Sequence, residues 1–432
     1  MTDKTRSVGD RGPGLVVLLF VAFASAYFLS ALVRAVTATL APVFSTELGL
    51  SAGDLGLLAG VYFASFAATQ LPMGSALDRW GPQRVLLVLL CAAVAGCWAF
   101  SRASTLGELL AARLLIGAGM SACLMAALTC FSHRLAPAVQ LRANAWMLMT
   151  GSLGMLASTL PVQWLLPVLG WRGVFEVVTG LLVLAMLLIW RWVPGGAHAG
   201  GGPEAASAAG AKPSRAAPPT GGYRVVFAHP AFIRMAPLAV CVYGGLLAMQ
   251  SLWIGPWLTR VVGQSAGQAA SGLFLVNLGM LVAFLCWGLV TPWLGRRGFG
   301  GERLIRWLLP LSLTGLFLLA WRGPATAAWA WMLWCVCTSV VTLSQPVVAQ
   351  AFPAALVGRA LSAYNLLIFA GVFLLQWGIG SLVDRLQAVG WGAADAFRLS
   401  VAVLALLCTL AYGWMLVRGR GSIMPTSLPD RR

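Results

Sequence analysis

Arg34 is the residue whose type and position most directly suggest chemistry in this sequence. It stands in the apolar stretch YFLSALVRAVTATLAPVF, ten residues before that stretch ends at Phe44. A permanent charge in the middle of a membrane helix costs about 2.5–3.5 kcal/mol or more, so a residue of this kind is expected to have both a partner and a function. The planar guanidinium group binds carboxylates and phosphates through two parallel hydrogen bonds.

The sequence offers no acidic residue at a comparable depth to pair with Arg34. The acidic residues nearest to apolar stretches, such as Glu47, Asp54, Glu108 and Glu176, fall close to the ends of those stretches. An anion that is not part of the chain is therefore the predicted partner of Arg34. The alternative is a structural arginine that binds backbone carbonyl groups or faces water.

Uncharged polar residues within other apolar stretches are candidates to line the same site. Hydroxyl and amide groups in membrane helices either contact a solute or form hydrogen bonds to a neighbouring helix, and the second role is the more common one. Alongside Arg34, we predict a substrate-binding role for Tyr62, Gln250, Asn277, Gln345 and Asn365.

The composition places the chain in a membrane. Of the 432 residues, 59% are hydrophobic and only 9% are charged, whereas about a quarter of the residues in soluble domains are charged. The apolar residues form long blocks near the ~20 residues that a helix needs to cross a bilayer. We therefore predict an all-α polytopic membrane protein with twelve transmembrane helices, at residues 15–43, 52–76, 85–103, 107–131, 143–168, 173–193, 232–258, 269–294, 304–321, 325–351, 360–383 and 398–417.

Lys and Arg are distributed unevenly between the two ends of these helices. With the N-terminus in the cytoplasm, only six of the 29 basic residues fall in outer loops, and two more, Arg34 and Arg113, lie within helices. This bias fits the positive-inside rule and predicts that both termini are cytoplasmic. A basic surface against anionic lipid also accounts for the net charge of +17 without a nucleic-acid partner.

A segment rich in Pro and Gly divides the chain after the sixth apolar block. It has no hydrophobic periodicity and too little apolar surface to fold alone. Two halves with six helices each indicate an internal repeat. We predict the following organisation: an N-terminal tail at 1–14, a six-helix bundle at 15–193, a flexible linker at 194–231, a second six-helix bundle at 232–417 and a C-terminal tail at 418–432.

The segment GSALDRWGPQRV at residues 74–85 gathers charge and glycine between the second and third helices. Gly74 permits close approach of two helices, and Gly81 permits a tight reversal of the chain. Asp78 can pair with an arginine or with the positive N-terminal end of a helix in the other half. We predict a latch that favours the outward-open state. The alternative is that Arg79 and Arg84 are only cytoplasmic anchors.

This segment resembles the signature of the major facilitator superfamily in the same loop. Arg113, Gly117 and Gly119 are similar to the family's fourth-helix motif, and the division into six and six helices also agrees. The resemblance implies two pseudo-symmetric bundles, alternating access and a conformational role for both motifs. Arg113 is expected near the outer end of its helix, where it reaches the interface or shapes the site entrance. The corresponding loop of the second half has Pro292 in place of the acid and is expected to lack a latch.

Residues 32–56 resemble the first-helix region of organophosphate:phosphate antiporters and related organic-anion symporters. In those proteins the arginine that matches Arg34 binds the anion, and Ser51 with Asp54 in this region predicts a capping box for the next helix. The antiporters use a second arginine in the seventh helix, whereas this sequence has VYGGLLAMQSLWIGPWL there. A single arginine favours a monoanion, such as a small carboxylate, over a dianionic phosphate ester.

The remaining features exclude several classes of function. The sequence contains no Walker sequence for ATP, no Cys-x-x-Cys and no histidine within an apolar block, so we expect no cofactor, no metal site and no enzymatic activity. We predict a monomeric secondary transporter of a small anionic solute, with protons as the candidate coupling ion. An Arg-rich, Lys-poor composition indicates a bacterial source and hence the inner membrane. The alternatives are an exporter of amphipathic drug-like or siderophore-like compounds, a transport-inactive sensor and a copper importer.

Overall fold

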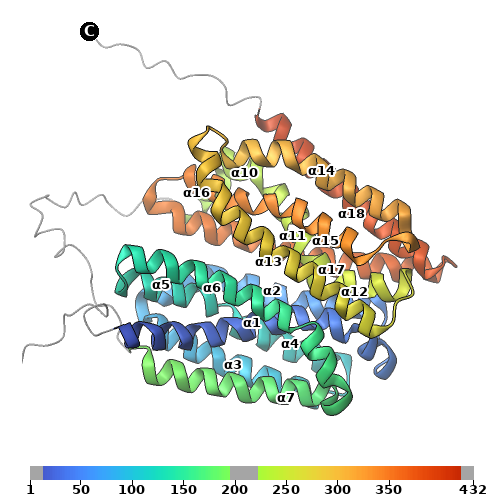
Figure 1. The fold of residues 1–432 in the computed structure, drawn as a ribbon, viewed down its shortest axis with the longest axis horizontal. Helices are drawn as coiled ribbons and strands as arrows, with labels where there is room; N and C mark the ends of the chain where they lie inside the picture. The colour runs from blue at the N-terminus through green and yellow to red at the C-terminus, as the bar shows by residue number, and fades with distance from the viewer. Residues whose placement is uncertain (1–12, 195–221, 420–432) are drawn as a thin grey trace, which may run out of the picture.

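The computed structural model describes residues 13–194 and 222–419, and nearly all of these residues are helical. The helices form two groups that lie side by side, one from each half of the chain (Figure 1). The predicted all-α fold is confirmed, and the chain is a multi-pass membrane protein. Most of the predicted linker and tails, at 1–12, 195–221 and 420–432, lies outside the described residues.

The first half contributes six membrane spans. Its helices are α1 (Pro13–Glu47), α2 (Ala52–Trp80), α3 (Pro82–Arg102), α4 (Leu106–Met120), α5 (Cys123–Arg134), α6 (Pro137–Ala157) and α7 (Leu160–Trp192). The fourth span consists of α4 and α5. Within α7, Gly170 has φ 63° and ψ 173°, a conformation that is essentially restricted to glycine. This break separates the end of the fifth span from the sixth.

The second half contributes the other six spans. Helix resumes at α9 (Gly222–Ala228), ahead of the expected boundary at residue 232. The seventh span, Pro230–Val261, begins with α10 (Pro230–Pro237) and continues through α-helical and π-helical turns that include α11 (Gly244–Ala248) and α12 (Ile254–Pro256). The later helices are α13 (Ala266–Arg296), α14 (Gly301–Arg322), α15 (Ala328–Thr338), α16 (Ser344–Gln350), α17 (Ala354–Ala388) and α18 (Ala393–Gly419). Eleven described helical segments are long and apolar enough to span a membrane, and α6 together with the part of α7 before Gly170 forms a further span, which brings the number to twelve.

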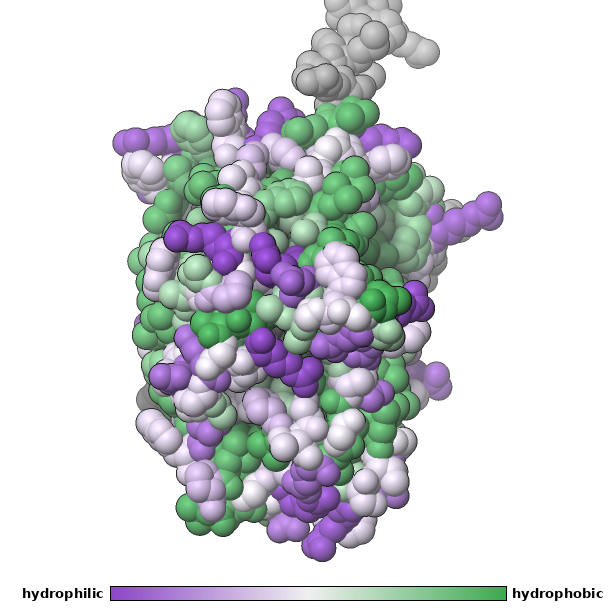
Figure 2. All heavy atoms as spheres, turned by 90° about the vertical axis from the view of Figure 1, so that its right-hand side faces the viewer, coloured by the Kyte–Doolittle hydropathy of each residue, from purple (hydrophilic) through white to green (hydrophobic). Residues whose placement is uncertain are grey.

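The two ends of the bundle differ in what they carry. We call the end that bears residues 194 and 222 the linker end, and the opposite end the far end (left and right in Figure 1). Figure 2 looks onto the far end, where hydrophilic side chains are spread over the end face and hydrophobic ones cover its flanks. This distribution fits a molecule whose flanks contact lipid and whose end faces water.

Three helices that start at the far end have complete capping boxes. At α2 the Ser51 hydroxyl accepts from the Asp54 amide, and the Asp54 carboxylate accepts from the Ser51 amide, as predicted from the sequence. Thr105 with Glu108 caps α4, and α13 is capped in the same way. These caps satisfy amides that the first turn of a helix leaves without a partner.

Candidate functional site

Arg34 lies on α1 at the boundary between the two halves, with its side chain partly buried. None of the ion pairs or side-chain hydrogen bonds of the described residues involves it. Its charge acts on Tyr62 of α2 and on Tyr243 of the seventh span. Since α1 and α2 belong to the first half and Tyr243 belongs to the second, the guanidinium group can be reached from both halves.

Two tyrosine side chains lie near this arginine. Of the six tyrosines in the chain, Tyr62 and Tyr243 are close enough to feel the charge of Arg34, and Tyr27 lies near Tyr243. The ring of Tyr27 fits closely against Gly151 of α6, where a methyl group would come within 2.6 Å of a ring carbon. Tyr27 and Tyr243 were not predicted, because nothing in the sequence shows which face of a helix they occupy.

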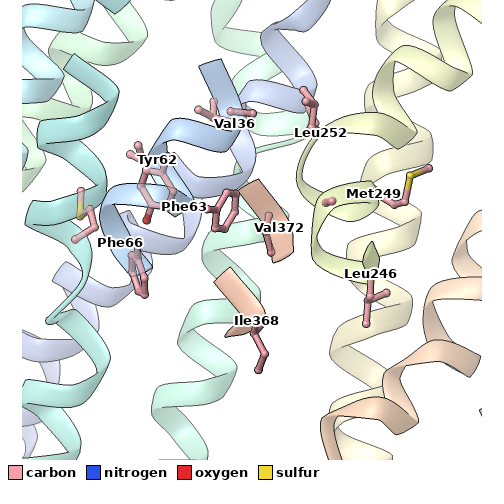
Figure 3. Packing of buried hydrophobic residues seen from close by; sticks show 14 of the residues in the cluster. Val36, Tyr62, Phe63, Phe66, Leu246, Met249, Leu252, Ile368 and Val372 are labelled. Carbon is pink, nitrogen blue, oxygen red and sulfur yellow. The ribbon is translucent and has the colours of Figure 1, made fainter. Parts of the chain in front are cut away.

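The hydroxyl group of Tyr62 is a donor without a partner. It is buried, and no described group has hydrogen-bonding geometry with it. Ser30 on α1 lies nearby, and its hydroxyl donates to the carbonyl of Met120 at 3.5 Å. Figure 3 shows Tyr62 on α2 close to Val36 of α1, with Phe63 and Phe66 on the same helix. A guanidinium group and a free phenol at neighbouring positions can both donate to one anion.

The four predicted amide side chains form two hydrogen-bonded pairs. Gln250 Nε2 donates to Asn277 Oδ1 at 2.9 Å, and both side chains are buried. This pair joins the seventh span to the eighth, as the helix-pairing alternative describes. Gln345 Nε2 donates to Asn365 Oδ1 at 2.7 Å between spans ten and eleven. Gln345 and Asn365 remain partly exposed, so a solute could still reach them.

Arg113 is buried inside the first half. The sequence predicts instead a position near the outer end of its helix, where the side chain reaches the membrane–water interface or shapes the site entrance. Its side chain is only 1% exposed, Nη1 donates to the carbonyl of Val33 at 3.1 Å, and Nη2 donates to the hydroxyl of Thr37 at 2.6 Å. The guanidinium carbon lies 4.8 Å from the centre of the Phe100 ring. Hydrogen bonds and the aromatic ring offset the cost of burying this charge. Val33 and Thr37 flank Arg34, so Arg113 fixes the turn of α1 that carries the candidate anion ligand.

The two glycines of the fourth-helix motif also act within the first half. A methyl group at Gly117 would collide with the backbone of Tyr62, and one at Gly119 would collide with the backbone of Ala93 on α3. Both glycines therefore let α4 approach α2 and α3 closely. Their contacts hold one half together and do not touch the other half.

The charged segment at the linker end makes the chain reversal that the sequence predicts. Gly81 ends α2 and precedes α3 with φ 80° and ψ 158°, a conformation open to glycine. Arg79 and Arg84 are exposed, and the Arg79 guanidinium carbon lies 5.6 Å from the centre of the Trp80 ring. No atom lies within 4 Å of where a Cβ of Gly74 would stand. The side chain of Asp78 lies outside what the structure describes.

The halves meet along several helix pairs, and the pair α2 and α17 is in contact from the far end inward. A Cβ at Gly56 would overlap the backbone of Gln376, and one at Gly60 would lie 3.0 Å from the Phe373 ring. Further in, the ring centres of Phe66 and Phe369 are 4.6 Å apart. Figure 3 shows Phe63 of α2 beside Val372 of this α17 segment. The contact between α2 and α17 is thus close at the far end and absent at Gly74.

Several solved structures share the fold of this chain. A bacterial homologue of the human lysosomal transporter Spinster, in an inward-facing and unoccupied conformation, has a TM-score of 0.74 at 18% identity and covers 95% of this chain and 98% of its own. A D-xylose–proton symporter has a TM-score of 0.74 at 13% identity, and the match covers 93% of this chain and 97% of the symporter. A nucleoside transporter has a TM-score of 0.70 at 11% identity, and the match covers 93% of this chain and 99% of the nucleoside transporter. At these identities the likeness establishes the fold alone.

Sequence comparison identifies the family. Among curated proteins, none matched the chain in sequence. A family model, in contrast, matches residues 23–376, which is most of the chain, and its description agrees with the resemblance of the segment at 74–84. The chain belongs to the Major Facilitator Superfamily and is a membrane transporter of that fold.

Proposed function

We propose that this transporter is a secondary carrier of a small organic monoanion and that Arg34 is its anion ligand. The observation that carries the proposal is a partly exposed guanidinium group at the boundary of the halves, with no carboxylate partner among the described residues. The acidic side chains that form ion pairs all lie near helix ends. An unpaired charge at this depth is costly, and an anion from outside the chain would lower that cost.

The neighbouring phenols would complete the recognition of a carboxylate. The free hydroxyl of Tyr62 can donate to one carboxylate oxygen while the Arg34 fork donates to the other. Tyr243 would add a contact from the second half. A bound anion would then touch both halves at once, so its binding energy differs between conformations, as alternating access requires.

The orientation proposed from the basic residues places the linker end in the cytoplasm of a bacterium. The described conformation, with its halves joined at the far end, would then face inward. Of the acidic groups considered for a proton route, Glu108 caps α4 and Glu176 pairs with Arg102. We therefore propose that any coupled proton crosses with the solute, and that the protein acts as a monomer without enzymatic activity.

A thermal-shift screen of the purified protein tests this proposal. The panel consists of monocarboxylates, dicarboxylates, nitrate, phosphate esters and neutral amphipathic compounds, each tested against wild type, Arg34→Gln and the control Arg102→Gln. A ligand at 100 times its Kd stabilises the native state by about 2.7 kcal/mol. We expect monocarboxylates to stabilise wild type and the control but not Arg34→Gln. Stabilisation of all three proteins by neutral compounds would instead support the exporter alternative.

A further inference from the structure

A short motif occurs twice in the chain, at the ends of the two helices that join the halves. Residues 74–79 read GSALDR at the end of α2, and residues 380–385 read GSLVDR at the end of α17. Both segments have Gly, Ser, Asp and Arg at matching positions. Since α2 and α17 run in opposite directions, the two motifs lie at opposite ends of the bundle: 74–79 at the linker end and 380–385 at the far end.

The motif of α17 makes a contact across the halves in this structure. The carboxylate of Asp384 accepts from the backbone amides of Ala52 at 3.0 Å and Gly53 at 2.7 Å, the first residues of α2. Gly380, the first residue of the motif, packs against the backbone of Ala52, where any Cβ would collide. An acid at the N-terminus of a helix satisfies free amides and interacts favourably with the helix dipole.

The far end of α2 depends on both halves for its capping. Its own residues Ser51 and Asp54 cap each other's amides, so among the described residues the two amides between them have only Asp384 as a side-chain partner. Arg260 of the seventh span lies close enough to Asp384 to interact with its charge and also donates to the hydroxyl of Ser45 on α1. The contact therefore connects α17 and the seventh span to α1 and α2.

The register of α2 on α17 continues to the other copy of the motif. Ala52 faces Gly380, Gly56 faces Gln376, and Phe63 faces Phe369. Eleven residues further along α2 is Gly74, and eleven residues back along α17 is Gly358. A Cβ at either glycine would meet no described atom within 4 Å, so the two backbones are apart at these glycines.

Continuing the register by four more residues places Asp78 opposite Ala354, the first residue of α17. The residue that precedes this helix is Pro353, and no side chain caps its N-terminus. The start of α17 thus has the free amides that Ala52 and Gly53 offer at the far end. The paired glycines would allow the same close approach there.

We propose that Asp384 forms a second latch, which holds the halves together at the far end and opens when the Asp78 latch closes at the linker end. Each latch consists of a Gly-Ser-x-x-Asp-Arg motif on one helix and the N-terminal amides of the other. Because α2 and α17 meet at one end while they are apart at the other, only one latch is closed at a time. The proposal rests on the two-state cycle of the superfamily fold and not on the identity of the solute.

Hydrogen–deuterium exchange of the full chain in lipid nanodiscs tests the second latch. Asp384→Asn keeps the size of the side chain but removes its charge. We expect it to shift the ratio of the two states roughly tenfold toward the alternative one, the size of effect typical for an acid at a helix N-terminus. Exchange should become faster for the start of α2 and slower for residues 354–358. If Asp384 were only a local cap, its loss would speed exchange at the start of α2 and leave exchange at residues 354–358 unchanged. That result would overturn the proposal.

Matched variants complete the test. Gly53→Ala would place a methyl carbon 2.6 Å from a carboxylate oxygen of Asp384, so it should reproduce the Asp384→Asn pattern with the acid still present. Asp395→Asn at the same end removes an acid bonded within its own half to Arg398 and should leave both regions unchanged. Combining Asp384→Asn with Asp78→Asn should return the exchange pattern toward wild type. An additive pattern in this double variant would contradict a linked pair of latches.

Discussion

A methyl group at Gly380 should shift the protein toward its other conformation without unfolding it. In the described conformation a Cβ there would lie 2.8 Å from the carbonyl carbon of Ala52 and 3.0 Å from the Cα of Gly53, and would overlap the Ala52 carbonyl oxygen. These atoms belong to backbone and cannot turn away. The clash exists only while the halves touch at the far end, so Gly380→Ala penalises one state and not the other.

The size of this effect follows from the cost of overpacking. Inserting a methylene into a well-packed contact costs about 1–3 kcal/mol, which corresponds to a factor of roughly 5 to 150 in the ratio of two states. Gly378→Ala is a matched control, because it lies on the same helix and its Cβ would meet no atom within 4 Å. This control should leave the ratio unchanged, and its melting temperature should stay the same or rise, because alanine favours a helix more than glycine does.

Pulsed electron paramagnetic resonance can measure the shift. Spin labels at Ser132→Cys on α5 and Arg297→Cys after α13 report the distance between the halves at the linker end, since both positions are exposed there. Of the native cysteines that the structure describes, only Cys91 and Cys286 are exposed and need replacement. We expect a new, shorter distance in Gly380→Ala. A wild-type distance distribution together with a lower melting temperature would refute the view that these helices separate during the cycle.

Three further substitutions test the structural roles of Arg113, Gly81 and Gln250. Arg113→Lys should cost about 2–4 kcal/mol of stability, more than Arg113→Met, because a lysine keeps the buried charge but loses the guanidinium fork and the ring contact. Thermal melts of both variants measure this difference. Equal melting temperatures of the two variants would contradict the prediction. Gly81→Ala should destabilise the protein by roughly 1–3 kcal/mol, because alanine strains at φ 80°; an unchanged melting temperature would contradict the strain. Gln250→Leu should lower the melting temperature without changing solute affinity, because it leaves the Asn277 amide unpaired at a cost of about 1–3 kcal/mol. A weaker solute affinity at unchanged stability would instead show that Gln250 contacts the solute.

The sequence predicts the spans well because the bilayer imposes a length on each one. The apolar blocks at 143–168 and 173–193 bracket the break at Gly170, and the reversal at Gly81 follows from a glycine in a short charged loop. Each of these features depends on residues close together in the chain. Local physics therefore suffices for them.

Which side of each helix faces a partner could not be predicted. In a membrane both the lipid side and the packed side of a helix are apolar, so hydrophobic periodicity does not show the orientation of a side chain. For this reason the inward direction of Arg113, the pairing of Gln250 with Asn277 and the gathering of Tyr27 and Tyr243 near Arg34 emerged only from the structure.

Contacts between the halves also could not be predicted from the sequence. Asp384 and Gly53 are 331 residues apart, and their contact depends on how one bundle leans on the other. The Gly-Ser-x-x-Asp-Arg repeat could have been found by comparing the ends of all helices. The loop of the second half that is equivalent to residues 74–85 lacks the motif, because Pro292 replaces the acid there.

Isothermal titration calorimetry measures whether Arg34 binds the transported anion. The titrant is the monocarboxylate that stabilises wild type best, added to wild type, Arg34→Lys and Arg34→Gln. A carboxylate 4 Å from a guanidinium group near a protein surface gains roughly 4 kcal/mol, and losing half of that weakens binding about 30-fold. We predict at least this loss for Arg34→Gln and a smaller one for Arg34→Lys, which keeps the charge without the fork. Equal affinity of wild type and Arg34→Gln for the anion would contradict the account.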